Sequence, residues 1–221
     1  MRRIVNAALS GLYPILDSRL VPKDQMAPAA RILAQCGVEQ LQLRMKRDSD
    51  ADRLRVQDAV SMALEGTGTL LVINDRSDLA RMLSREAPPG VRVGLHLGQD
   101  DMDPRRARDI VGDGIHMSWS THTLEQVEAS AGLPLDGLAY GPVFDTANKE
   151  NPDATVGVAG LTRAASAAPW PLTAIGGIDA GTVALCMDAG AASVAVIGAL
   201  FGAFAMDDLQ RRTAMMLSGA R

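Results

Sequence analysis

A short apolar segment followed by a helical segment repeats eight times along the chain, and this repeat limits the possible folds more than any other feature. In the first unit, residues 12–16 are strand-like, and Ala30, Leu33 and Ala34 then recur at helical spacing before Gly37. The eight predicted strands cover residues 12–16, 40–43, 70–73, 93–97, 115–120, 137–140, 172–175 and 193–197.

Strands that alternate with helices form parallel sheets. Eight such units in 221 residues match a compact (β/α)8 barrel better than an open doubly wound sheet. We therefore predict an α/β fold with a single domain, a (β/α)8 TIM barrel over residues 1–221. In such barrels the functional side chains lie at the carboxyl ends of the strands and in the loops that follow them.

Two neighbouring predicted strands end in carboxylates. The strand at 70–73 runs into an Asn-Asp pair that ends at Asp75, and the strand at 93–97 leads to Asp101. An alternative for the first is turn chemistry, in which Asp75 or Ser77 caps the next helix. Two carboxylates on one rim predict a Mg²⁺ site, because Mg²⁺ takes one or two protein carboxylates and keeps water and substrate phosphate as its other ligands.

Glycine-bearing loops follow the seventh and eighth predicted strands, at residues 176–178 and 198–202. Glycine lets backbone N–H groups approach an anion closely, and the N-terminus of a following helix favours negative charge. TIM barrels often bind phosphate at these two loops. The pair predicts a phosphate-binding cup.

The longest irregular segment covers about residues 141–157. Structureless loops of this length are usually lids, binding loops or disordered segments. This one carries the hydroxyls of Thr146 and Thr155, the amide of Asn148 and the cation Lys149. It therefore predicts a lid over a phosphorylated substrate, with a solvated surface loop as the alternative for Lys149.

The charge pattern argues against nucleic-acid and membrane partners. The net charge is −4, the 22 basic and 26 acidic residues are interspersed, and aromatics make up only 3%.

Asn6 interrupts the apolar run that a signal peptide would need, and no segment is long enough to span a bilayer. Cys36 and Cys186 lack the spacing of a zinc or redox pair, which indicates reduced thiols. We predict a cytoplasmic protein with small-molecule partners; because α/β barrels are often dimers, a homodimer is one assembly to test.

Seven segments resemble, in order, the successive motifs of the thiamine-phosphate synthase family. The resemblance runs from about the first predicted strand to the eighth, and the segments lie on the predicted rim. The segments are Gln-Leu-Arg-Met-Lys (42–46), Ile-Asn-Asp-Arg (73–76), His-Leu-Gly-Gln-Asp-Asp (96–101), Ser-Thr-His-Thr (120–123), Gly-Pro-Val-Phe-Asp-Thr-Ala-Asn-Lys (141–149), Ala-Ile-Gly-Gly-Ile (174–178) and Val-Ala-Val-Ile-Gly-Ala (194–199).

The resemblance implies a transferase that joins 4-amino-2-methyl-5-hydroxymethylpyrimidine diphosphate to thiazole phosphate, giving thiamine phosphate and pyrophosphate. It implies Mg²⁺ bound by Asp75 and Asp101 rather than Asp100. For the diphosphate it implies Arg44, Lys46, Asn74 and Lys149, of which Arg44, Lys46 and Lys149 would be catalytic. For the pyrimidine it implies Gln42 and Ser120. For the thiazole phosphate it implies Thr146, Asn148, Gly177, Ile197 and Gly198.

This sequence departs from the family pattern at three positions. Asn148 stands where the family often has threonine, and Gly198 stands where it often has serine, so the phosphate cup has one amide in place of a hydroxyl and lacks another hydroxyl. Met45 stands where many members have glutamate. Side chains alternate along a strand, so Met45 should point away from Arg44 and Lys46 and have little effect.

Three other functions stay open at this stage. A thiazole tautomerase of the same family would use His122 as acid or base, unless His122 only begins a helix. A Schiff-base aldolase would use Lys46 or Lys149 as nucleophile. A phosphate-binding module without activity is the third. Assaying the protein with both substrates and Mg²⁺, with and without chelator, separates these readings.

Overall fold

Eight parallel strands form a closed barrel in the computed structural model, which describes residues 10–145 and 154–220. Each strand pairs with the next, and β8 closes the ring on β1, where Gly11 is in register with Ser193. The strands are β1 (Gly11–Asp17), β2 (Gln40–Arg44), β3 (Leu70–Asn74), β4 (Arg92–Leu97), β5 (His116–Thr121), β6 (Gly137–Tyr140), β7 (Leu172–Ile175) and β8 (Ser193–Val196). The predicted (β/α)8 barrel is confirmed.

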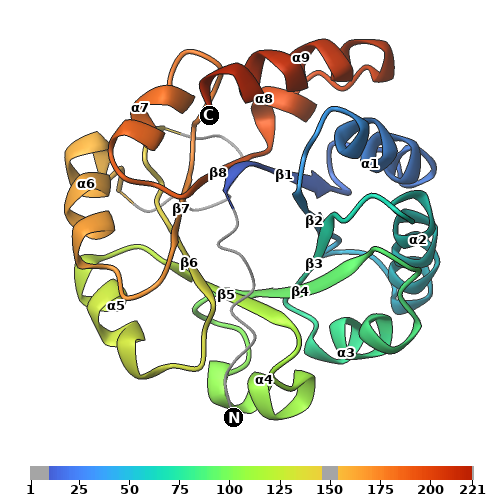
Figure 1. Cartoon of the computed structure of the whole chain (residues 1–221), viewed down its shortest axis with the longest axis horizontal. Coiled ribbons are helices and arrows are strands. Elements are labelled where there is room, and N and C mark those ends of the chain that lie inside the picture. The colour runs from blue at the N-terminus through green and yellow to red at the C-terminus, as the bar shows by residue number, and fades with distance from the viewer. Residues whose placement is uncertain (1–9, 146–153, 221) are drawn as a thin grey trace.

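Helices form a ring outside the strands (Figure 1). They are α1 (Met26–Gln35), α2 (Asp50–Ala63), α3 (Ser77–Glu86), α4 (Pro104–Val111), α5 (Leu124–Ala129), α6 (Gly157–Ala167), α7 (Val183–Asp188), α8 (Gly198–Phe201) and α9 (Met206–Gly219), with 3-10 turns η1 (Lys23–Gln25) and η2 (Ser130–Gly132). Local chemistry explains the start of α4. Pro104 takes the first position of α4, and the Asp103 side chain accepts from the backbone N–H of Arg105.

The core has two apolar layers because side chains alternate along each strand. Leu71 and Ile73 of β3 belong to the large cluster between strands and helices, whereas Leu70 and Val72 belong to a small cluster inside the barrel. Polar side chains fill much of the remaining interior. Those buried on the inner face include Asp17, Gln40, Gln42, His96, His116 and Ser118.

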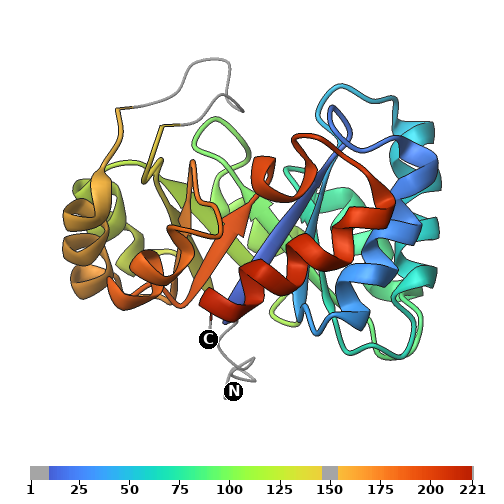
Figure 2. The same cartoon turned by 90° about the horizontal axis from the view of Figure 1, so that it is seen from above.

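The loops that follow the strands lie on one side of the barrel. In the side view of Figure 2, the loop after β4 (green) and the short helix α8 after β8 (red) both stand on the upper side. Those residues implied by the family resemblance that the structure describes lie at this rim or directly below it. The lid prediction falls largely on residues 146–153, outside the described residues. Among the described helices none is long and apolar enough to cross a membrane.

Candidate active site

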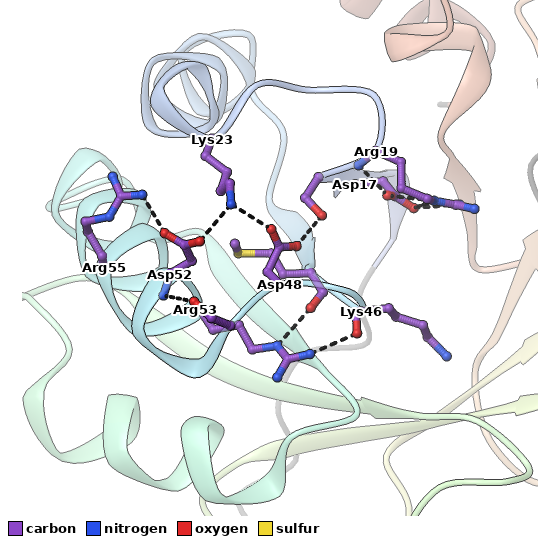
Figure 3. Close-up of polar contacts among 11 residues, drawn as sticks. Asp17, Arg19, Lys23, Lys46, Asp48, Asp52, Arg53 and Arg55 are labelled. Atoms are coloured by element: carbon purple, nitrogen blue, oxygen red, sulfur yellow. Dashed lines mark hydrogen bonds and ion pairs between the residues drawn. The ribbon is translucent and has the colours of Figure 1, made fainter.

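A buried carboxylate holds two arginines at the rim of β1 and β2. Asp17 ends β1, is 1% exposed, and is in register with Arg44 at the end of β2. Its carboxylate accepts a hydrogen bond from Arg44. It also accepts from Nε of Arg19 at 3.0 Å and from Nη2 of Arg19 at 2.8 Å (Figure 3). Burial alone would raise the pKa of Asp17, but the hydrogen bonds from Arg19 and the charge of Arg44 outweigh it and lower the pKa. The three groups carry one net positive charge.

Asp75 directly follows β3, the strand next to β2, and has an unusual backbone conformation. Its φ is +64°, the only positive value for a non-glycine residue in the described part of the chain. Its N–H donates to the carbonyl of His96 at 2.8 Å, and its Oδ2 lies 3.3 Å from Nζ of Lys46. The capping alternative is wrong, because α3 begins at Ser77 and its N-cap residue is Arg76. Strained backbone of this kind tends to occur at functional sites.

The second predicted carboxylate meets the first. The pKa of Asp75 is raised to about 6, chiefly by burial and next by hydrogen bonding with Asp101, while the charge of Lys46 opposes the rise. Asp101 is half-buried, and its Oδ2 accepts from the N–H of Gly98 at 2.6 Å, whereas Asp100 is exposed.

These two carboxylates fit the chemistry of Mg²⁺. A partly buried pair of carboxylates whose negative charges are incompletely balanced gains from a divalent cation. No third acidic, histidine or cysteine side chain completes a cluster with them within the described ranges. Two protein carboxylates are enough, since Mg²⁺ keeps water and phosphate as further ligands.

A neutral histidine orients the serine implied for pyrimidine binding. His96 of β4 is buried, and burial lowers its pKa to about 4. Its Nδ1 lies 2.8 Å from Oγ of Ser118, and its Nε2 lies 2.9 Å from Oγ of Ser120. One ring nitrogen therefore donates and the other accepts, which fixes the hydroxyl of Ser120.

Gln42 lies inside the barrel, on the same strand face as Arg44 and two residues below it. It is 2% exposed, and its Nε2 donates to the hydroxyl of Tyr13 at 3.0 Å. The implied pyrimidine contact is thus deep in the barrel.

The loops after β6 and β7 are bound to each other. The N–H of Val143 donates to the carbonyl of Ile175, and the N–H of Phe144 donates to that of Gly176. Gly177 has φ +65°, and a Cβ there would lie 2.4 Å from the carbonyl oxygen of Asp145. Only glycine fits this approach.

Ile197 and Gly198 stand at the end of β8. Ile197 is the N-cap residue of α8, and Gly198 is its first residue. Gly198 is not among the glycines with positive φ, so its backbone conformation is open to other residues. The other thiazole-phosphate residues, Thr146 and Asn148, lie outside the described residues, as does Lys149.

Comparison with known proteins decides the family. Residues 12–200 match the protein family described as thiamine monophosphate synthase. The chain belongs to this family. The thiamine-phosphate synthase of Koribacter versatilis is 38% identical over 196 residues, which cover 87% of this chain and 89% of that protein. That of Agrobacterium fabrum is 36% identical over 197 residues, covering 87% and 86%.

The chain is also similar to a solved structure. Thiamine phosphate pyrophosphorylase from Pyrococcus furiosus has a TM-score of 0.80 at 25% identity, and the match covers 95% of each chain. The predicted resemblance to the thiamine monophosphate synthase family is confirmed, and with it the prediction that the protein is an enzyme of the transferase class.

The motifs of the thiamine monophosphate synthase family gave no role to three residues of the site. Asp17 holds Arg44, Arg19 shares that carboxylate, and His96 orients Ser120. Two weak signals were available. Asp17 directly follows the predicted strand at 12–16, and His96 is a polar residue within the predicted strand at 93–97.

Proposed function

We propose that the protein condenses 4-amino-2-methyl-5-hydroxymethylpyrimidine diphosphate with thiazole phosphate to give thiamine phosphate and pyrophosphate. One observation carries the proposal. In a chain of this family, Asp75 meets Asp101 and Lys46 at the rim where Arg44 is also held. An acidic pair beside fixed cations suits a diphosphate with its metal ion.

The reaction demands stabilisation of a charged leaving group. The C–O bond between the methylene carbon and the diphosphate breaks, and both bonding electrons leave with pyrophosphate. The remaining pyrimidinylmethyl cation is stabilised by its own ring amino group and is captured by the thiazole nitrogen. Preorganised cations in a water-poor site favour such a separation, and no side-chain nucleophile is needed.

We assign the leaving diphosphate to Arg44, Lys46 and Asn74, with Lys149 of the proposed lid added by family resemblance. Asp17 keeps the guanidinium of Arg44 at the rim while Arg19 preserves a net positive charge there. Asp75 and Asp101 would hold Mg²⁺. When bound, Mg²⁺ supplies charge neutralisation on the diphosphate oxygens.

The two organic substrates are assigned to different sides of the barrel mouth. Gln42 and Ser120 would contact the pyrimidine, with Ser120 oriented by neutral His96. The thiazole phosphate would lie near β7 and β8. Its proposed contacts are Thr146, Asn148, Gly177, Ile197 and Gly198.

Two alternatives are less well supported. His122, the proposed tautomerase acid or base, has Nδ1 2.7 Å from the carbonyl oxygen of Gly141 and immediately precedes the N-cap residue of α5, which favours a structural role. Lys46 forms an ion pair with Asp75, and its side chain is 46% exposed, whereas Schiff-base lysines are typically desolvated.

The deciding experiment is an assay of purified protein with both substrates and Mg²⁺. Thiamine phosphate and pyrophosphate should form in equal amounts, and chelator should stop the reaction until Mg²⁺ is restored. Binding of phosphorylated ligands without turnover would instead support a silent phosphate-binding module. The proposal includes a single domain with a lid at about 141–157, a cytoplasmic location and, to be tested by light scattering, a homodimer.

A further inference from the structure

Arg53, in the first turn of α2, holds the loop that carries Lys46. Its Nε donates to the carbonyl of Met45 at 2.8 Å, and its Nη2 donates to the carbonyl of Lys46 at 2.9 Å. Figure 3 shows the guanidinium reaching from the helix to these two oxygens. The carbonyls belong to the two peptide groups on either side of the Lys46 Cα, so one side chain fixes both.

The geometry requires arginine. A guanidinium is planar and presents several N–H donors in a fixed fork, whereas an ammonium is a single point on a flexible stem. Arg53 is half-buried, with 21% of its side chain exposed. Its bond to the Met45 carbonyl is partly buried, whereas its bond to the Lys46 carbonyl is exposed to solvent. The backbone from which the Lys46 side chain departs is thus held at two consecutive carbonyls.

A second contact links this clamp to the carboxylate site. Asp50 accepts from Nη1 of Arg53 at 2.7 Å and from Nη1 of Arg76 at 2.5 Å, and Arg76 directly follows Asp75. Asp50 is exposed, so these ion pairs contribute little energy. The carbonyl bonds are the stronger part of the arrangement.

The far end of the same loop is held separately. Asp48 accepts from the hydroxyl of Ser18 at 2.6 Å and pairs with Nζ of Lys23 at 3.0 Å (Figure 3). Loss of Arg53 would therefore release the backbone around Lys46 and leave the end of the loop attached.

We propose that Arg53 is a positioning residue for the reaction: it touches no substrate and fixes Lys46 so that its ammonium faces the leaving diphosphate. This inference rests on the proposed function. It adds a requirement that none of the family motifs contains.

The test compares Arg53→Ala with Arg55→Ala. Arg55 lies two residues later in α2, is 64% exposed and donates to Asp52 on the surface, so it is a matched control. Arg53→Ala should lower kcat/KM for the pyrimidine diphosphate by roughly tenfold or more, since small misplacements of catalytic groups are costly. KM for the thiazole phosphate should stay unchanged, and Arg55→Ala should match the unaltered protein.

A double-mutant cycle tests whether the effect passes through Lys46. In a Lys46→Ala background, Arg53→Ala should cause little further loss. If the losses of kcat/KM from the two substitutions simply multiply in the double variant, the inference is wrong. It is also wrong if Arg53→Ala keeps full activity while Lys46→Ala is impaired. If Arg53→Ala does not fold, Arg53→Lys takes its place, with a smaller loss and the same dependence on Lys46. Absence of turnover by the unaltered protein would refute the proposed function itself.

Discussion

At the scale of single residues, the site depends on a carboxylate in a conformation that few side chains adopt. Asp75 combines a positive φ, partial burial and contact with Lys46. We expect Asp75→Ala and Asp101→Ala each to nearly abolish turnover while the far-ultraviolet circular dichroism is unchanged. Asp100→Ala should do much less, because Asp100 is exposed. Equal losses at Asp100 and Asp101 would mean that the wrong carboxylate has been assigned to the metal.

A second prediction concerns the missing hydroxyl at position 198. Because Gly198 lacks a positive φ, serine can adopt its conformation. Gly198→Ser should lower KM for the thiazole phosphate by up to roughly tenfold, as one hydrogen bond to a charged group is worth about 1.5 to 3 kcal/mol and water recovers part of it. Steady-state kinetics with each substrate varied will test this. A change confined to the pyrimidine KM would reverse the assignment of the two substrates.

At the scale of elements, the loops after β6 and β7 need glycine where they meet. Gly177→Ala should destabilise the protein by about 3 kcal/mol or more, because its Cβ would lie 2.4 Å from a backbone oxygen. Gly37→Ala is the control: its φ is also positive, at +92°, but no atom lies within 4 Å of the added Cβ. It should cost only about 1 kcal/mol. Urea unfolding measures both, and equal losses would show that the close approach is not limiting.

Periodicity predicted the elements well because each βα unit is a local pattern. The strands at 137–140 and 172–175 have the predicted bounds. Asp75 and Asp101 could be assigned to one rim from the strand order alone. The pairing of Asp17 with Arg44 could not be predicted from the sequence, since it depends on the register of β1 and β2. The contact of Arg53 with the loop that carries Lys46 could not be predicted either, because it depends on the path of that loop.

At the scale of the whole molecule, the barrel end opposite the site has its own polar network. Arg108 of α4 donates to the carbonyl of Ile115 at 2.7 Å and to the carboxylate of Asp136 at 2.6 Å. Asp136 also accepts from the N–H of Met117 at 2.9 Å. His116 is buried beside this network. In TIM barrels this end serves stability, whereas the rim carries function.

Burial of neutral His116 predicts acid sensitivity. Its pKa is lowered from 6.5 to about 4, chiefly by desolvation. Between pH 6.5 and about 4, the imidazole of residue 116 binds a proton in the unfolded chain but not in the folded protein. The contribution of His116 to the free energy of unfolding is therefore fully present above pH 6.5 and falls as the pH drops toward 4. His116→Gln should remove a few kcal/mol of this dependence. Urea unfolding of both proteins at pH 7.5 and 4.5 tests it, because other titrating groups cancel in the comparison. Parallel pH profiles would contradict it.

Closure of the barrel by β8 has a consequence for synthesis of the chain. Gly11, among the first described residues, is in register with Ser193, and Gly198 follows directly after that strand. A ribosome-bound chain that stops short of Ser193 therefore has unpaired edges on β1 and β7, which are sites of aggregation. It also lacks the last part of the proposed thiazole-phosphate site. Synthesis of β8 and Gly198 therefore both covers the exposed strand edges of the nascent chain and completes the rim of the barrel.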